Sequence, residues 1–395
     1  MSDPNPPVVP PTDPVPLPPA DQALPAVRYS PRSITLSVSL LTSAVLAAGL
    51  AVLPAPYVVD SPGPTKNVLG EQDGTPLIAI TGAPTYDSTG ELRLTTVSEV
   101  GSPGYPALAP QVIGGWLSRS SLVRPVETTG DAGQTQEQVQ QTNAALMVSS
   151  QENATVAALT ELGYEVPATL TVAGVQDGTG AVGVLAEGDV MTAIDGTPLP
   201  DYATMVRTLA ATTPGSTITV RVQRAGASLD LPVVTGARPD GGARIGVYVD
   251  PTFDPPVDVK ISIDGIGGPS AGTMFALGII DRMTPQDEAN GQVIAGTGTI
   301  DVTGAVGAIG GIQQKMAGSR RDGAAWFLAP VSNCADVVGH VPDGLRVVAV
   351  STLHEAREAV VAIGAGRGDT LPTCTAAATP EATATPSGTA STPAG

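Results

Sequence analysis

An uncharged apolar segment, Ile34–Leu53 (ITLSVSLLTSAVLAAGLAVL), constrains the fold of this chain more than any other feature. A helix rises 1.5 Å per residue, so a segment of roughly 20 residues crosses a hydrocarbon core of about 30 Å. Arg28 and Arg32 precede the segment, and Asp60 follows it. The positive-inside rule therefore predicts a cytoplasmic N-terminus, with everything after residue 53 outside the cell membrane.

A cleaved signal peptide is the alternative interpretation of this segment. Its Pro-rich leader is unusually long for a signal peptide, and AGLAVLPAPY offers only a weak cleavage site, so we expect an uncleaved single-pass anchor over 34–53. Residues 1–33 are Pro-rich, and residues 375–395 are rich in Thr, Ala and Pro. Neither tail can bury a core, so both are predicted to be disordered.

The charge balance excludes some classes of partner. The 395 residues include 19 Lys and Arg against 37 Asp and Glu, a formal net charge of −18. An acidic chain cannot neutralise phosphates, so we expect no nucleic-acid partner. The two cysteines and two histidines match no zinc-binding pattern, so neither a metal nor another cofactor is expected. Lysine occurs at only three positions, which makes each of them informative.

Residues 166–238 form a distinct module. Their sequence predicts a strand, a Gly-Asp pair, a helix and a hairpin, at Leu170–Val175, Gly188-Asp189, Tyr202–Ala211, and Thr217–Arg224 with Ala227–Val234. This order resembles a PDZ domain of the bacterial periplasmic type. The resemblance implies a groove that binds an extended peptide, usually through its C-terminal carboxylate. The alternative is a small packing module whose groove is unused.

Ser270 is the candidate nucleophile. Apolar and polar residues alternate from Val257 to Ile263, which predicts a half-buried strand. Gly267 and Gly268 permit a sharp turn after it, and Ser270 opens an apolar helix with Pro269 at an early position. The free N–H groups at a helix N-terminus suit a developing oxyanion. The alternative is that Ser270 only caps the helix.

A serine nucleophile also needs a base. GPSAG at 268–272 matches the G-x-S-x-G elbow of α/β-hydrolases, which would require a later acid and histidine. The available residues are Asp301 or Asp336 with His340 or His354. The alternating strand before Ser270 disfavours this class, because a central parallel strand is continuously apolar. Both histidines also lie in surface-like stretches.

Lys315 is the other candidate base. It follows a double glycine, in IGGIQQK at 309–315, and shares the apolar side of a predicted helix with Ile312. A lysine acts as a base only when neutral, so its pKa has to fall from about 10.4 to about 7–8. Burial in an apolar wall lowers the pKa in this way. The alternative, an exposed helix lysine, is disfavoured in a chain with so few.

Together these pieces resemble the proteolytic domain of the Lon family. The matching stretches are GGPSAG at 267–272, TGTI at 297–300, GAVGAIGGIQQKMAGSRRDGA at 304–324 and LAPVSNC at 328–334. The resemblance implies an α/β fold and a serine endopeptidase that cleaves polypeptides. It further implies a dyad in which Ser270 attacks, Lys315 is the general base and the Thr297 hydroxyl orients Lys315. Lon-type domains commonly assemble as homo-oligomeric rings, which is implied here too.

The chain departs from Lon in two respects. It has no G-x-x-x-x-G-K-[ST] phosphate loop, so proteolysis without ATP is expected. Gly267 stands where Lon often has an acid. The layout resembles the membrane-anchored, PDZ-containing Lon-like proteases of Gram-positive and actinobacterial type. Residues 54–165, with a strand at Glu91–Glu99 and a helix at Gln136–Leu162, are then the first part of the protease fold, and 239–374 the remainder. The PDZ module would be inserted between them.

Two further expectations follow from this layout. A disulfide between Cys334 and Cys374 is allowed outside the cytoplasm. It would close a loop of about 40 residues and contribute about 3–4 kcal/mol. The alternative function, from another class, is a catalytically silent membrane scaffold whose PDZ groove binds peptides.

Overall fold

The computed structural model describes residues 30–102, 104–128, 135–238 and 241–375. The predicted tails at 1–33 and 375–395 therefore lie outside the described residues, apart from 30–33 and 375. The chain divides into two compact units, Met1–Leu53 and Pro54–Gly395. Each unit is described separately below.

The first unit contains the helix α1, Pro31–Ala51, in which no residue is buried. It begins three residues earlier than the apolar segment suggests, because Pro31 occupies the first turn and the Ser30 side chain accepts a hydrogen bond from the Ser33 N–H. It is the one helix among the described residues that is long and apolar enough to cross a membrane. This makes α1 a candidate membrane span.

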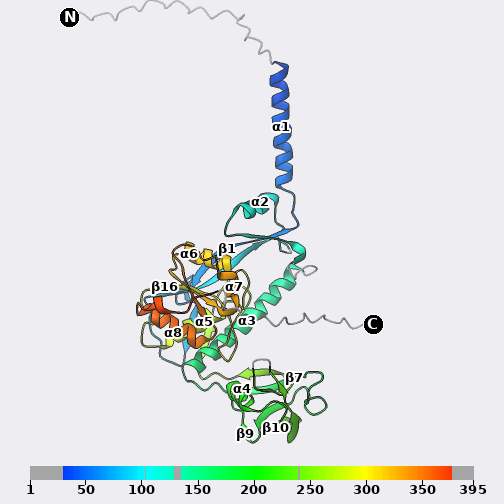
Figure 1. The fold of residues 1–395 in the computed structure, drawn as a ribbon, viewed down its shortest axis with the longest axis vertical. Coiled ribbons are helices and arrows are strands. Elements are labelled where there is room, and N and C mark those ends of the chain that lie inside the picture. The colour runs from blue at the N-terminus through cyan, green and yellow to red at the C-terminus, as the bar shows by residue number, and fades with distance from the viewer. Residues whose placement is uncertain (1–29, 103, 129–134, 239–240, 376–395) are drawn as a thin grey trace, which may run out of the picture. The chain divides into compact units, whose positions relative to one another are not determined.

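The second unit is built on a six-stranded sheet in the order β20-β19-β16-β5-β1-β6. Two of these strands, β1 and β16, are labelled in Figure 1. The strands span Tyr57–Asn67 (β1), Glu91–Val100 (β5), Leu122–Pro125 (β6), Val293–Gly296 (β16), Trp326–Pro330 (β19) and Arg346–Val350 (β20). Strands β5, β16, β19 and β20 are parallel, whereas β1 is antiparallel to both of its neighbours. Three strands of this sheet precede the PDZ segment and three follow it, so one sheet is assembled from both sides of that segment.

Helices cover both faces of this sheet. Alternate residues of β16, β19 and β20 point in opposite directions, as the period of two requires. Ile294, Leu328 and Val348 pack with α3 (Gln136–Glu161), α5 (Gly272–Met283) and α8 (Leu353–Gly364). Ala295, Phe327 and Val347 pack on the other face with α6 (Ile312–Arg321) and α7 (Cys334–Val337). The helix α5 is buried along nearly its whole length, which explains its continuous apolar sequence.

The PDZ segment forms a second sheet in the order β11-β10-β8-β7-β14, with β9 beside β8. Its elements are β7 (Ala168–Val175), β8 (Val190–Ile194), β9 (Thr197–Pro198), α4 (Tyr202–Ala211), β10 (Thr217–Arg224), β11 (Ala227–Val234) and β14 (Val247–Phe253). They enclose a separate core of residues such as Leu170, Ile194 and Val220. The Gly-Asp pair has a structural role, because buried Asp189 accepts hydrogen bonds from the Arg224 guanidinium and the Ala186 N–H.

This PDZ sheet runs past residue 238, where the sequence placed the end of the module. Strand β14 pairs antiparallel with β7 along its whole length and forms the sheet edge. The sequence alone did not indicate this pairing, because β14 is separated from β11 by a turn-rich stretch. Short strands complete the fold at Glu71–Gln72 (β2), Thr75–Pro76 (β3), Ile78–Thr81 (β4), Gly236–Ala237 (β12), Ala243–Arg244 (β13), Asp258–Ile261 (β15), Thr299–Ile300 (β17) and Val306–Gly307 (β18).

The remaining structural feature predicted from sequence is the cysteine pair. Cys334 and Cys374 form a disulfide with an S–S distance of 2.05 Å. Cys334 is fully buried at the start of α7, and Cys374 packs against the core on the α6 face of the sheet. The bond therefore ties the end of the described chain to the domain built on the six-stranded sheet.

Candidate active site

Ser270 lies in the turn that connects β15 to α5. The strand predicted at Val257–Ile263 is shorter in the structure, Asp258–Ile261, and pairs with β4 in a two-stranded sheet. The helix begins at Gly272, with Ala271 as its N-cap residue. The sequence predicted that Ser270 opens this helix and that Pro269 lies in its first turn. Both predictions are wrong, because both residues precede the helix. The α5 N-terminus has no side-chain cap, so the interpretation of Ser270 as a helix cap is wrong.

The two glycines before Ser270 have distinct roles in this turn. Gly268 adopts a φ of 84°, in the left-handed region that side chains disfavour. Gly267 lies so close to α3 that an added Cβ would approach the Asn143 Cβ to 2.9 Å. The Gly268 N–H donates to the Asn143 carbonyl at 3.0 Å. An acid at position 267 would not fit without displacing α3, which accounts for the departure from the Lon pattern.

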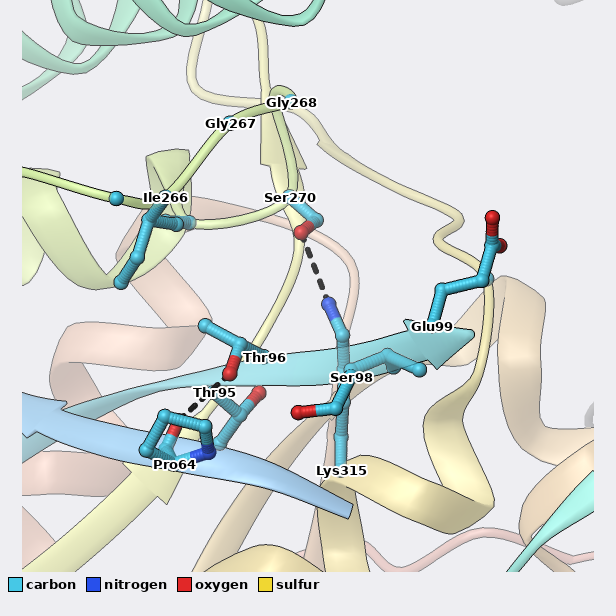
Figure 2. A pocket seen from close by; sticks show the side chains of 14 residues that line it. Pro64, Thr95, Thr96, Ser98, Glu99, Ile266, Gly267, Gly268, Ser270 and Lys315 are labelled. Carbon is cyan, nitrogen blue, oxygen red and sulfur yellow. Dashed lines mark hydrogen bonds between the residues drawn. The ribbon is translucent and has the colours of Figure 1, made fainter. Parts of the chain in front are cut away.

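Lys315 extends from α6 toward Ser270. Its Nζ lies 2.9 Å from the Ser270 Oγ (Figure 2). The same atom lies 2.9 Å from the Thr297 Oγ1. The Thr297 hydroxyl in turn donates to the Ser270 carbonyl at 3.0 Å. Residues separated by 45 positions in sequence are thus in hydrogen-bond contact. This is the nucleophile–base geometry that an activated serine requires.

The surroundings of Lys315 perturb its protonation. The side chain is 4% exposed, and Thr297 is completely buried. Burial lowers the pKa of the Lys315 ammonium from 10.5 to about 8, because the charged form loses its hydration. A lysine with this pKa is neutral in roughly a tenth of molecules at pH 7, far more than a lysine with the ordinary pKa. Among the described residues, no group of three His, Cys, Asp or Glu side chains is arranged to hold a metal ion.

A cavity of about 590 Å³ opens onto the Ser270–Lys315 pair. Its wall includes the turn Gly265–Gly268 and the strand segment Thr95–Glu99 of β5 (Figure 2). Strand β16 pairs with β5 only over Glu91–Leu94, so the next part of β5 faces the cavity on that edge. Sequence analysis predicted this strand but not its place at the site, since no motif near residue 95 indicates it.

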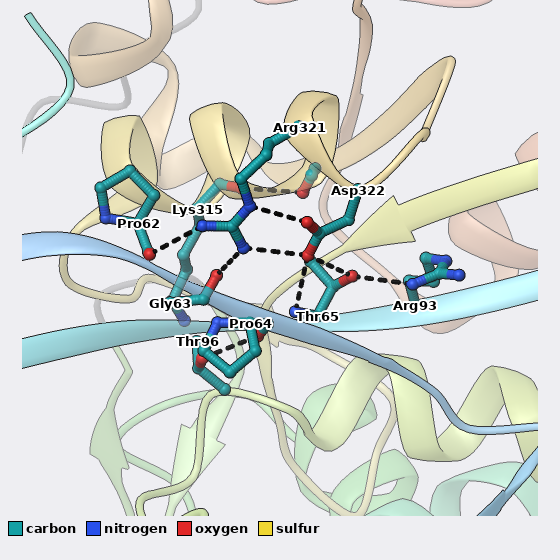
Figure 3. A network of polar contacts seen from close by, with 10 residues as sticks. Pro62, Gly63, Pro64, Thr65, Arg93, Thr96, Lys315, Arg321 and Asp322 are labelled. Carbon is teal, nitrogen blue, oxygen red and sulfur yellow. Dashed lines mark hydrogen bonds and ion pairs between the residues drawn. The ribbon is translucent and has the colours of Figure 1, made fainter. Parts of the chain in front are cut away.

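Helix α6 is held against β1 by a polar network at its C-terminal end (Figure 3). Arg321 donates to the backbone carbonyls of Pro62 and Gly63, and it forms an ion pair with Asp322. Asp322 also accepts from the Thr65 N–H and hydroxyl, each at 3.0 Å. Hydrogen bonding from Arg321 is the main cause that lowers the pKa of Asp322 to about 2. The network fixes the helix that carries Lys315.

The residues of the rival hydrolase interpretation lie elsewhere. The exposed His340 ring contacts the Val338 carbonyl, and the His354 ring contacts Glu161. Asp301 accepts hydrogen bonds within its own turn, from Thr303 and Ala305. None of these residues lines the cavity at Ser270. The structure therefore does not bring a histidine and an acid to this serine.

A second cavity, of about 330 Å³, lies in the PDZ module between α4 and the edge strand β14. Its lining includes Met205 and Leu209 from the helix and Val247 and Val249 from the strand. The sequence predicted a PDZ groove but not the strand that forms its wall. The alternation of Val247 and Val249 was the available signal.

Comparison with known families agrees with this geometry. Residues 261–362 match the Lon protease (S16) C-terminal proteolytic domain, a range that contains Ser270, Thr297 and Lys315. Residues 139–235 match the PDZ domain. The chain thus combines a Lon-type proteolytic domain with a PDZ domain in a mixed α/β fold, with one candidate N-terminal membrane helix. The predicted resemblance to PDZ-containing Lon-like proteases is confirmed at the level of these domains, which support a serine peptidase.

Individual relatives cover only part of the chain. Lon protease 2 of Bacillus subtilis (strain 168) is 31% identical over 109 residues, which are 26% of this chain and 19% of the relative. Lon protease 1 of the same organism is 31% identical over 117 residues, 28% of this chain and 15% of the relative. The chain therefore spans less than a fifth of the length of either relative.

Solved structures that resemble the chain include the PDZ domain of the SdrC-like protein (Lmo2051) from Listeria monocytogenes. It is 22% identical, with a TM-score of 0.20, and the match covers 20% of this chain and 86% of that one. An HtrA-type protease, AlgWS227A with decapeptide, is 24% identical with a TM-score of 0.16, over 22% of this chain and 33% of that one.

Proposed function

We propose that this protein is a membrane-anchored serine endopeptidase that works without ATP through a Ser270–Lys315 dyad. One observation carries the proposal: the buried Lys315 Nζ lies 2.9 Å from the Ser270 Oγ, with its pKa lowered to about 8. Neutral Lys315 removes the Ser270 proton as the oxygen attacks the scissile carbonyl. The lysine then gives that proton to the leaving amine. Water hydrolyses the acyl-enzyme by the same proton path in reverse.

Two supporting roles follow. The Thr297 hydroxyl accepts from the Lys315 amine and donates to the Ser270 carbonyl, so it positions the lysine relative to the nucleophile. Backbone N–H groups of the turn just before α5 are the candidate donors for the oxyanion of the tetrahedral intermediate, because those of Gly272 and Thr273 already donate to the Pro269 and Gly298 carbonyls. Neither role requires a metal or a nucleotide. We infer that ATP is not used.

The site suits an extended polypeptide substrate. The Thr95–Glu99 segment of β5 presents a strand edge to the cavity that contains Ser270. A peptide that pairs with this edge would satisfy its backbone hydrogen bonds and lie across the nucleophile. Polypeptides that are unfolded or locally extended are therefore the proposed substrates.

The PDZ domain is proposed to select these substrates. Edge strand β14 has β7 on one side, and its other side faces the cavity below α4. An extended C-terminal peptide would add as a further strand there, with one apolar side chain against Met205 and Leu209. Replacing Met205 by Lys should weaken binding of such peptides, while hydrolysis of a short peptide without a C-terminal anchor should stay unchanged.

The proposed location is the cell membrane, with α1 as a single-pass anchor. The N-terminus would be cytoplasmic and the PDZ and protease domains extracytoplasmic, as the flanking charges indicate. A disulfide in the protease domain suits an oxidising compartment. Protease added to intact cells should degrade the chain from the outside. We also propose a homo-oligomeric ring, to be measured by light scattering in detergent.

The catalytic proposal is tested by peptide hydrolysis in four proteins: wild type, Ser270→Ala, Lys315→Ala and the double variant His340→Ala/His354→Ala. Loss of activity in the first two variants and its retention in the third supports the dyad. Loss in Ser270→Ala and in the histidine variant, with activity retained in Lys315→Ala, supports a hydrolase. No hydrolysis by any of them, together with intact peptide binding, identifies a scaffold.

The pH profile adds an independent test of the base. With a pKa of about 8, Lys315 is neutral in roughly a tenth of molecules at pH 7. We therefore expect kcat/KM to rise about tenfold between pH 7 and 9 and then level off. Addition of apyrase should leave the rate unchanged, because no nucleotide takes part. A profile that levels off near pH 6.5 would indicate a histidine base.

A further inference from the structure

An apolar surface at helix α2 (Ala109–Leu117) has no role in the proposed chemistry. The inner side of the helix packs on the protein through Val112 and Gly115. Its outer side carries Ile113, Trp116 and Leu117, whose exposed fractions are 53%, 61% and 81%. A helix that is apolar on both sides, with one side uncovered, marks an interaction surface.

The backbone ties this helix to the end of α1. Helix α1 ends at Ala51, and three residues later Pro54 forms a β-bridge with Leu108, the N-cap residue of α2. The Ala55 N–H donates to the Ala107 carbonyl at 2.8 Å beside that bridge. Three residues span at most roughly 10 Å. Whatever the orientation of α1, and with about 5 Å added across the β-bridge, the start of α2 therefore lies within about 15 Å of the end of the candidate membrane span.

The composition of this region also suits a lipid surface. Residues 101–126 contain no Asp or Glu, although the whole chain carries a net charge of −18. Of the two arginines in this range, Arg124 is ion-paired with Asp60 and Glu99, so the attraction to a bilayer rests on Arg119. Basic residues near a bilayer are attracted to anionic headgroups. Trp116 is one of only two tryptophans, and its ring packs edge-on against Tyr57 with centroids 5.6 Å apart. Tyr105, 59% exposed, lies in the same segment. Tryptophan and tyrosine are enriched at membrane interfaces.

We propose that α2 is a second membrane contact: its outer face lies in the headgroup region of the leaflet into which α1 is anchored, with Trp116 and Leu117 in contact with acyl chains. The partner is an anionic phospholipid bilayer. This inference rests on the proposed anchoring of α1. The contact would hold the protease close to the membrane surface and limit its reach to polypeptides that emerge there.

The experiment uses the full chain, reconstituted in vesicles of equal parts phosphatidylcholine and phosphatidylglycerol with brominated acyl chains. Trp326→Phe leaves Trp116 as the only tryptophan, and Trp116→Phe leaves Trp326, which is 8% exposed in β19. Emission from Trp116 is expected to fall roughly twofold relative to unbrominated vesicles, because an interfacial indole contacts the acyl chains. Emission from Trp326 is expected to stay unchanged.

Vesicle flotation separates failure of this inference from failure of the anchor. A chain that does not float contradicts the anchor and removes the basis of the inference. A chain that floats with Trp116 unquenched, or with both tryptophans quenched alike, overturns the inference and leaves the anchor intact. Leu117→Asp should abolish the quenching of Trp116 while flotation and peptide hydrolysis persist. If the surface instead contacts a second copy, Trp116 will be unquenched and Leu117→Asp will lower the particle mass in detergent, which also overturns the inference.

Discussion

Replacing Lys315 by Met should inactivate the protein and at the same time stabilise it. Burial lowers the pKa of Lys315 from 10.5 to about 8, so charging this lysine costs about 3 kcal/mol more in the folded state than in the unfolded state. Methionine has a similar length and no charge, so it should fill the same space without that cost. We expect the free energy of unfolding to rise by about 1–3 kcal/mol at neutral pH. This figure allows for the loss of the hydrogen bonds to Ser270 and Thr297.

The difference in stability between Lys315→Met and wild type should decrease as the pH rises. The unfolded lysine keeps its proton up to about pH 10.5, whereas the folded one releases it near pH 8. The unfolded state therefore binds more protons in this window, and the stability of the wild type rises with pH across it. The difference between Lys315→Met and wild type should shrink as the pH rises from about 8 to about 10.

The measurement is urea unfolding of the full chain in detergent, followed by the emission of Trp326 in a Trp116→Phe background. Trp326 lies in β19, in the same sheet that α6 covers, so its emission reports on the protease body. Gln314→Met, a neighbouring buried residue on α6, is the control for a general effect of added apolar surface. A Lys315→Met chain that is less stable than wild type at neutral pH would refute the reasoning. So would a difference that does not change with pH.

Three further predictions concern the residues around the dyad. Thr297→Val should lower kcat about 10–100-fold with little change in KM, because it removes the group that orients Lys315; a change confined to KM would contradict that role. Asp322→Asn should lower the free energy of unfolding, measured with urea, by roughly 1 kcal/mol; this figure allows for the partial exposure of Asp322. Because Arg321 lowers the pKa of Asp322 to about 2, this contribution is present above about pH 4 and lost as the pH falls toward 2; a difference that persists at pH 2 would argue against it. Replacing both Cys334 and Cys374 by Ser should lower the free energy of unfolding by about 3–4 kcal/mol. Reduction should then lower the stability of the wild type and leave the stability of this variant unchanged.

Local patterns in the sequence predicted much of the secondary structure. The helix Tyr202–Ala211 and the hairpin strands Thr217–Arg224 and Ala227–Val234 have the predicted bounds. Their apolar periodicity and the turn between them are local properties. The start of α5 was placed too early, because Ser270 belongs to a turn whose conformation depends on Gly268 and on contact with α3.

Strand pairings between segments far apart in the chain could not be predicted from the sequence in the same way. Strand β14 joins the PDZ sheet from beyond residue 238, and β5 forms a wall of the Ser270 cavity from some 170 residues earlier in the chain. Each strand is recognisable alone, but its partner depends on which apolar faces meet when the core forms. The exposed surface of α2 was also hidden, because its sequence is apolar on both sides.

The sequence by itself determined the kinds of residue that the proposed chemistry needs and the families that the chain resembles: a serine after a glycine turn, a rare lysine after a double glycine, and a threonine between them. Only the tertiary structure decided that they meet. It brings the Lys315 Nζ within 2.9 Å of the Ser270 Oγ, buries it beside Thr297 and lowers its pKa to about 8. The physical reason is that residue type and spacing are encoded locally, whereas burial and desolvation arise only when helices α5 and α6 pack around a common sheet.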